Sequence, residues 1–71
     1  MEQPTIKQIP ANRLKELRDR SRLTLPEVAT LTGYDTTTIS KYENRRRALT
    51  EEAIRKFAAL YKVQTHELFV L

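Results

Sequence analysis

Several residue types that build chemical sites are scarce in this chain. Its 71 residues include no cysteine, which excludes a disulfide framework and a cysteine-ligated metal. The single histidine, His66, has no carboxylate cluster beside it. Because a metal site or a catalytic base needs partner ligands or an orienting group, we assign His66 a structural or surface role. We therefore expect no metal, no cofactor and no enzymatic activity.

Long apolar runs are also missing. No stretch approaches the ~18 consecutive apolar residues of a membrane span, and the N-terminus lacks the apolar segment of a signal peptide. We expect a cytoplasmic protein without membrane contacts. A chain of this length supports one small core, so we expect neither a ligand-sensing domain nor a small-molecule partner.

Positive charge is in excess. The chain has 13 Lys and Arg against 9 Asp and Glu, a net charge of +4, and a pI near 9.8. This balance favours a polyanionic partner. The densest charge is the run Arg45, Arg46 and Arg47, which could contact phosphates or form a solvated basic loop.

The only glycine lies at the centre of the clearest local pattern. Gly33 follows an apolar-periodic segment and can end a helix in the left-handed conformation. Asp35 can then cap a second helix, and upstream Thr24 and Glu27 have the spacing of a capping box. The pattern predicts two short helices, over residues 25–32 and about 36–44, joined by a tight turn.

The second of these helices has two chemically different sides. At ~100° per residue, Ile39, Tyr42 and Glu43 share one face. The polar residues on the opposite side are Thr36, Thr37, Ser40 and Lys41. Hydroxyl, methyl and ammonium groups suit the edges of DNA bases, although an ordinary solvated face is the alternative.

A helix predicted over residues 11–20 places Arg18 on its inward stripe, where the guanidinium needs an anion. Glu43 is the expected partner. Thr50 is expected to cap a fourth helix, and Thr65 to cap a last helical turn that carries Leu68.

The two ends of the chain are expected to behave differently. Residues 1–9 have no helical period and are expected to form a flexible arm, or a frayed terminus, ahead of a domain over residues 10–71. The chain ends with four apolar residues, which exceed what one side of a helix can bury. We expect them to form a two-fold dimer interface; the alternative is that the tail folds back over its own core. They are Leu68, Phe69, Val70 and Leu71.

The whole array resembles the phage-repressor, or Cro/Xre-like, helix-turn-helix family. The matching pieces are Leu23-Thr24, Glu27-Val28-Ala29, Thr32-Gly33 and residues 38–44 with Arg46 beyond; residues 12–18, Ala53-Ile54 and Leu68-Phe69 extend the match to about residues 10–69. The resemblance implies an all-α, compact five-helix DNA-binding domain. Its third helix would enter the major groove, usually as a dimer on a pseudo-palindromic operator.

The resemblance thus implies a sequence-specific transcriptional regulator of repressor or controller type. The residues expected to read bases are Thr36, Thr37, Ser40 and Lys41, and those expected to contact phosphates are Thr24, Asn44, Arg45, Arg46 and Arg47. A second hypothesis keeps the fold but uses its surfaces on another regulatory protein, as an antitoxin or an antagonist would.

Two positions depart from the family pattern. Leu25 stands where such proteins usually carry a glutamine that meets the DNA backbone, so we expect that contact to be lost. Lys62 stands where the family commonly has glycine after its fourth helix, so we expect a strained connection there.

Overall fold

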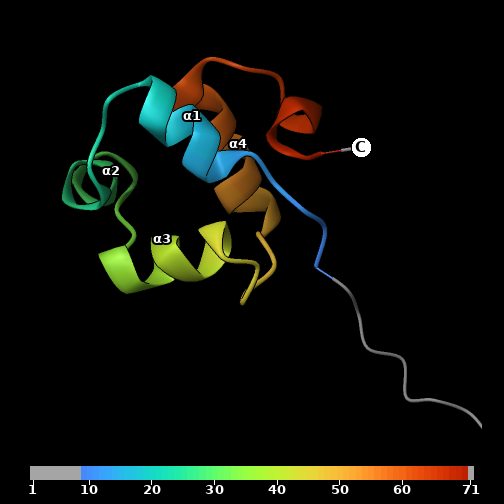
Figure 1. Ribbon diagram of the computed structural model, residues 1–71, viewed down its shortest axis with the longest axis horizontal. Coiled ribbons are helices and arrows are strands. Elements are labelled where there is room, and N and C mark those ends of the chain that lie inside the picture. Colours follow the sequence, from blue (N-terminus) through green and yellow to red (C-terminus); the bar gives the residue numbers. More distant parts are fainter. Residues whose placement is uncertain (1–8, 71) are drawn as a thin grey trace, which may run out of the picture.

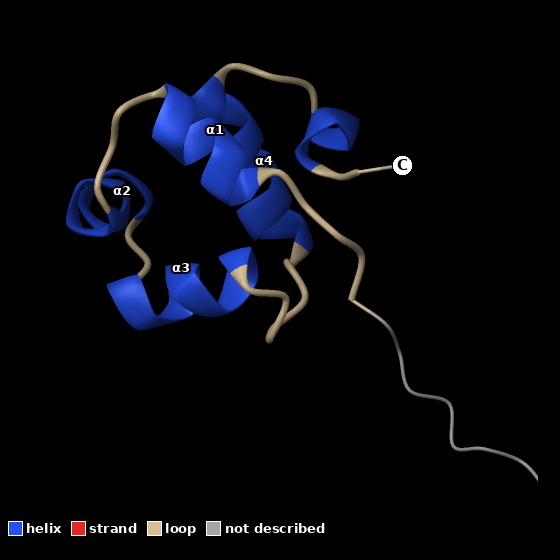
Figure 2. Ribbon diagram, viewed as in Figure 1, coloured by secondary structure: helices blue, strands red, loops and turns tan. Residues whose placement is uncertain are grey.

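The computed structural model describes residues 9–70, which contain four α-helices and one 3-10 helix joined by loops. They are α1 (Leu14–Arg20), α2 (Leu25–Thr32), α3 (Thr36–Glu43), α4 (Glu51–Tyr61) and the 3-10 helix η1 (Thr65–Leu68). Figures 1 and 2 show α3 along the lower border of the molecule, with α2 beside its beginning and α1 and α4 above it in this view. The predicted all-α class is confirmed.

The last helix differs from the expectation. The count of five α-helices is wrong, because η1 is a four-residue 3-10 turn. It begins after Gln64, whose N–H donates to the Glu67 carboxylate at 2.7 Å, so Thr65 lies inside the turn and does not cap it.

The first helix also begins later than expected, at Leu14. Residues 11–13 stay outside the helix because they pair with the chain's other end: Arg13 N–H donates to the Leu68 carbonyl at 2.7 Å, and Val70 N–H donates to the Ala11 carbonyl at 3.0 Å. The Asn12 side chain accepts from Leu14 N–H and donates to the Tyr42 carbonyl. Groups from distant parts of the chain thus supply the hydrogen bonds that a helical turn would otherwise make here.

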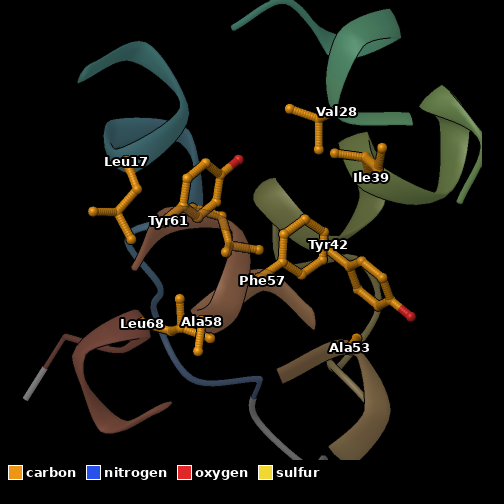
Figure 3. Close-up of a cluster of buried hydrophobic side chains, with 10 residues drawn as sticks. Leu17, Val28, Ile39, Tyr42, Ala53, Phe57, Ala58, Tyr61 and Leu68 are labelled. Atoms are coloured by element: carbon orange, nitrogen blue, oxygen red, sulfur yellow. The ribbon is translucent and has the colours of Figure 1, made fainter. Parts of the chain in front are cut away.

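One core lies where all these elements meet. Figure 3 shows Phe57 of α4 among side chains from every other helix, including Tyr42 of α3 and Leu68 of η1. The Phe57 ring meets Tyr42 edge to face, with centroids 6.0 Å apart, and stacks on Tyr61 at 6.2 Å. Aromatic pairs at these separations add to the free energy gained from burial.

The C-terminal tail corrects one expectation. Leu68 has no exposed surface and belongs to the core of its own chain, so it cannot contact a second copy as expected. Phe69 is half-buried, whereas Val70 is 53% exposed. Leu71 and most of the expected arm, residues 1–8, lie outside the described residues.

The helix-turn-helix segment has the local geometry that the sequence predicts. Gly33 ends α2 with φ +86°, and the Asp35 carboxylate accepts a hydrogen bond from Thr38 N–H at 3.0 Å. Thr24 and Glu27 form the reciprocal capping box: Thr24 N–H donates to the Glu27 carboxylate, and Glu27 N–H donates to the Thr24 hydroxyl. These contacts fix where α2 begins and ends, and where α3 begins.

A buried ion pair connects α1 to α3. Arg18 donates to the Glu43 carboxylate through Nε at 2.7 Å and through Nη2 at 3.2 Å, and its Nη1 donates to the Leu23 carbonyl. The side chains are only 13% and 5% exposed. Because each charge compensates the other inside the protein, loss of either one leaves an unpaired buried charge.

The Tyr61 phenol lies within the electrostatic field of this pair. Burial raises the pKa of Tyr61 to about 12; the charge of Glu43 adds to this increase, and that of Arg18 opposes it. The phenol is therefore neutral at physiological pH and adds no third charge to the pair.

Replacing Arg18 by alanine is expected to destabilise the domain by ~3–5 kcal/mol, because Glu43 would remain buried without a partner. Such a loss is a large part of the stability of a small domain and is measured by urea or thermal unfolding. Arg20→Ala is the matched control, since Arg20 is 66% exposed and lies 3.7 Å from Glu16 in a surface pair. It should cost at most ~1 kcal/mol. Equal melting temperatures for the two variants would contradict the assignment.

Three basic residues adopt the left-handed conformation that favours glycine. Arg22, Arg45 and Lys62 have φ values of +59°, +60° and +56°, and each follows the end of a helix. The expected strain at Lys62 therefore coincides with a left-handed backbone. The turn also closes hydrogen bonds, because Val63 N–H donates to the Ala58 carbonyl at 3.0 Å.

Lys62→Gly is expected to stabilise the protein by ~0.5–1 kcal/mol, because glycine adopts this φ without the Cβ clash. The gain is reduced by glycine's larger entropy in the unfolded chain. In thermal unfolding it corresponds to an increase of about 2–8 °C. Lys62→Ala removes the same charge but keeps the Cβ atom, so it should show no increase; equal gains for both variants would assign the effect to charge.

Candidate nucleic-acid interface

The outward side of α3 forms the floor of a concave surface. Thr36, Thr37 and Lys41 are exposed and Ser40 is half-buried, while Ile39 and Tyr42 on the opposite side are buried. All four residues expected to read bases line this concavity, which we call the α3 concavity. Its lining residues are Leu25, Thr36, Thr37, Ser40, Lys41, Asn44 and Arg46.

Asn44, directly after α3, lines the α3 concavity. Its amide Nδ2 donates to the Ser40 carbonyl at 2.9 Å and to the Ser40 hydroxyl oxygen at 3.2 Å. These bonds orient the amide so that its oxygen remains an available acceptor. The Ser40 hydroxyl, which accepts from Asn44, keeps its own proton for donation to a ligand.

The three consecutive arginines differ in their surroundings. Arg45 takes the left-handed conformation after α3, and Arg46 N–H then donates to the Lys41 carbonyl at 2.8 Å, which turns the chain back along the helix. Arg46 consequently lines the α3 concavity, whereas Arg45 and Arg47 do not. The Arg45 guanidinium donates to the Ile9 carbonyl through Nε at 3.0 Å and Nη2 at 2.7 Å.

Thr24, expected to contact phosphate, lies at the start of α2 and is used in the capping box. Its N–H donates to the Glu27 carboxylate at 2.8 Å, and its hydroxyl oxygen accepts from Glu27 N–H. Only the hydroxyl proton remains free to donate to a phosphate. Thr24 is not among the residues that line the α3 concavity.

Charge around α3 is strongly asymmetric. Lys41 and the three arginines are exposed, whereas Glu43, the only acidic residue among residues 36–47, is buried against Arg18. Asp35 directly precedes α3 and is the nearest exposed acidic residue along the sequence. Hydrogen bonding with the Thr38 side chain and then its N–H lowers the pKa of Asp35, and the charge of Arg47 adds to the effect. The Asp35 cap is therefore ionised at neutral pH.

Lys56 of α4 supports the turn from outside the α3 concavity, a role that the sequence pattern did not reveal. Its ammonium donates to the Thr32 carbonyl at 2.9 Å, lies 5.0 Å from the centre of the Tyr34 ring, and is 3.7 Å from the Glu52 carboxylate. A cation at this position gives a carbonyl at the end of α2 a hydrogen-bond donor and interacts favourably with the helix dipole next to Gly33. The only advance signal was a lysine four residues after a glutamate, which is common on exposed helices.

Polar and charged groups dominate the lining of the α3 concavity. Within residues 9–70, no three His, Cys, Asp or Glu side chains gather as a metal site requires. In the same range, no helix is both long enough and apolar enough to cross a membrane. The α3 concavity instead combines hydroxyls, an amide, an ammonium and a guanidinium, which are donors and acceptors for a polar, anionic surface.

Comparisons with known proteins agree with this geometry. A family model described as a helix-turn-helix domain matches residues 11–69, which includes all four α-helices and the capped turn between α2 and α3. The comparison with curated proteins found no match. Since the matched range covers most of the chain, the protein belongs to the helix-turn-helix domain family of the Xre/Cro-like type.

Proposed function

We propose that this protein is a sequence-specific transcriptional regulator, of repressor or controller type, that binds a palindromic operator in double-stranded DNA as a homodimer. It would act in the cytoplasm and would not be an enzyme. The observation that supports the proposal best is the α3 concavity, where Thr36, Thr37, Ser40 and Lys41 lie together on the outward side of the second helix of a helix-turn-helix. Side chains so grouped on one helix can enter a major groove together.

The surrounding charge supports the same proposal. Arg46 lies beside the polar side chains of α3, while Arg45 and Arg47 are exposed on the same loop. In a groove-entering complex these guanidiniums would meet the phosphates that flank the bases, and Asn44 and the Thr24 hydroxyl would add neutral contacts. Phosphate contacts would set orientation, and α3 would read sequence.

Binding to duplex DNA is tested by a salt titration with random duplexes, followed by selection of bound sequences. Affinity should fall steeply between about 50 and 200 mM salt, because each neutralised phosphate releases counterions. Selection should return a palindrome with half-sites spaced by ~10 bp. No detectable binding at low salt would exclude the proposal.

Two variants should separate the phosphate and base contacts. Arg46→Ala should weaken binding to all sequences alike and reduce the salt slope by about one unit, because it removes one phosphate contact. Thr37→Ala should keep the salt slope and change the preference at one base position, because Thr37 is exposed on α3. Affinities are measured by fluorescence anisotropy at several salt concentrations. Identical behaviour of the two variants would refute this assignment of roles.

The proposed dimer uses the tail residues that its own core leaves accessible. Val70 is one of two large apolar residues with more than half of their surface exposed among residues 9–70, at 53%, and half-buried Phe69 precedes it. Their backbone is held in place, because Val70 N–H donates to the Ala11 carbonyl. A fixed, exposed apolar segment suits a self-complementary contact between two copies.

Val70→Asp is expected to convert the dimer to a monomer without unfolding it, since an exposed carboxylate in an apolar interface lacks a partner. The molar mass is measured by sedimentation velocity, with thermal unfolding as a check of the fold. Leu31→Asp introduces the same charge at the other exposed apolar residue, which is 59% exposed on α2, and should leave the mass unchanged. A dimer that persists in Val70→Asp would rule out this interface.

A protein-interaction module remains the second candidate. The exposed apolar side chains of Leu31 and Val70 favour it, as does Leu25 in an otherwise polar concavity. An antitoxin or an antagonist of another regulator could use such groups on a protein surface. The salt titration distinguishes the two functions, because a module without DNA affinity should not bind random duplexes at low salt.

A further inference from the structure

Leu25 is the one apolar side chain among the residues that line the α3 concavity. The others are polar or charged, and Thr36 and Thr37 each carry a methyl group beside their hydroxyl. Leu25 is half-buried and packs against the hydrophobic core, so the core holds its side chain while part of it stays accessible. A held, partly exposed leucine offers a preorganised apolar contact to whatever occupies the concavity.

The backbone at this end of α2 offers little to a phosphate. Pro26 has no N–H, the Glu27 N–H is bonded to the Thr24 hydroxyl, and the Glu27 carboxylate adds a negative charge. A free helix N-terminus attracts anions through its unbonded N–H groups and its dipole, but here both effects are weakened. Leu25 is the one residue of α2 among those that line the concavity, so its accessible side chain is what α2 presents there.

Among the groups exposed in the major groove of DNA, the 5-methyl group of thymine is the apolar one. We propose that Leu25, with the methyl groups of Thr36 and Thr37, forms a contact for a thymine methyl group and so determines specificity at one operator position. This inference rests on the proposed DNA binding and assigns to Leu25 a base-reading role in place of the lost backbone contact. The methyl group would move from water into contact with three apolar groups, a favourable transfer.

The test substitutes uracil for each thymine of the selected operator in turn, which removes only the methyl group. At one position in each half-site, the parent protein should bind the uracil duplex about fourfold more weakly, the effect of one buried methyl-sized group. Leu25→Gln, similar in length but polar, should bind both duplexes with affinities within about twofold of each other. Leu31→Ala, at an exposed leucine of α2 that does not line the α3 concavity, should keep the parent's sensitivity to uracil.

Thermal unfolding of Leu25→Gln ensures that its affinity is compared in the folded state, and Leu25→Ala provides a second variant if glutamine disturbs the packing. The proposal is overturned if no uracil substitution affects the parent, or if both Leu25 variants retain the effect. In those cases the proposed function is still supported if the unmodified operator binds with the expected salt dependence. Absence of any duplex binding would instead refute the proposed function, and this inference with it.

Discussion

Burial of one side of α3 decides what its other side can do. Ile39 has no exposed surface and Tyr42 has 3%, and both pack where all the helices meet (Figure 3). Helical geometry then turns Thr37 and Lys41 outward, because these positions lie across the helix from the buried ones. A rotation of α3 that hid the polar side would have to expose Ile39, at a cost of ~1.5–3 kcal/mol for its burial alone. The polar surface is thus a consequence of the core.

Two cations from other helices hold α2 and α3 in this orientation. Arg18 of α1 binds Glu43 inside the protein, and Lys56 of α4 donates to the Thr32 carbonyl where α2 ends. Neither lines the α3 concavity. Basic residues in this chain therefore have two physical roles: some neutralise internal groups and fix the helices, while others remain on the surface. Net charge alone does not distinguish these roles.

Basic residues also occupy the left-handed positions that follow three of the helices. With one glycine in the chain, Arg22, Arg45 and Lys62 take left-handed conformations after α1, α3 and α4. Each is strained by its Cβ atom but brings a positive charge close to a helix C-terminus, where the dipole favours it. At Arg45 the turn has a further effect, because it directs Arg46 back along α3.

The sequence alone determined α2, the turn and α3, because caps, glycine and apolar periodicity act between residues a few positions apart. The caps and the glycine, at Thr24, Glu27, Gly33 and Asp35, suffice for the bounds of α2 and for the start of α3. The apolar periodicity identified which side of α3 faces outward. Only the tertiary structure decided the late start of α1, the 3-10 form of η1 and the burial of Leu68. These features depend on pairing between residues 11–13 and 68–70. The different surroundings of the three arginines were also decided there, because backbone turns and distant carbonyls leave no periodic trace in the sequence.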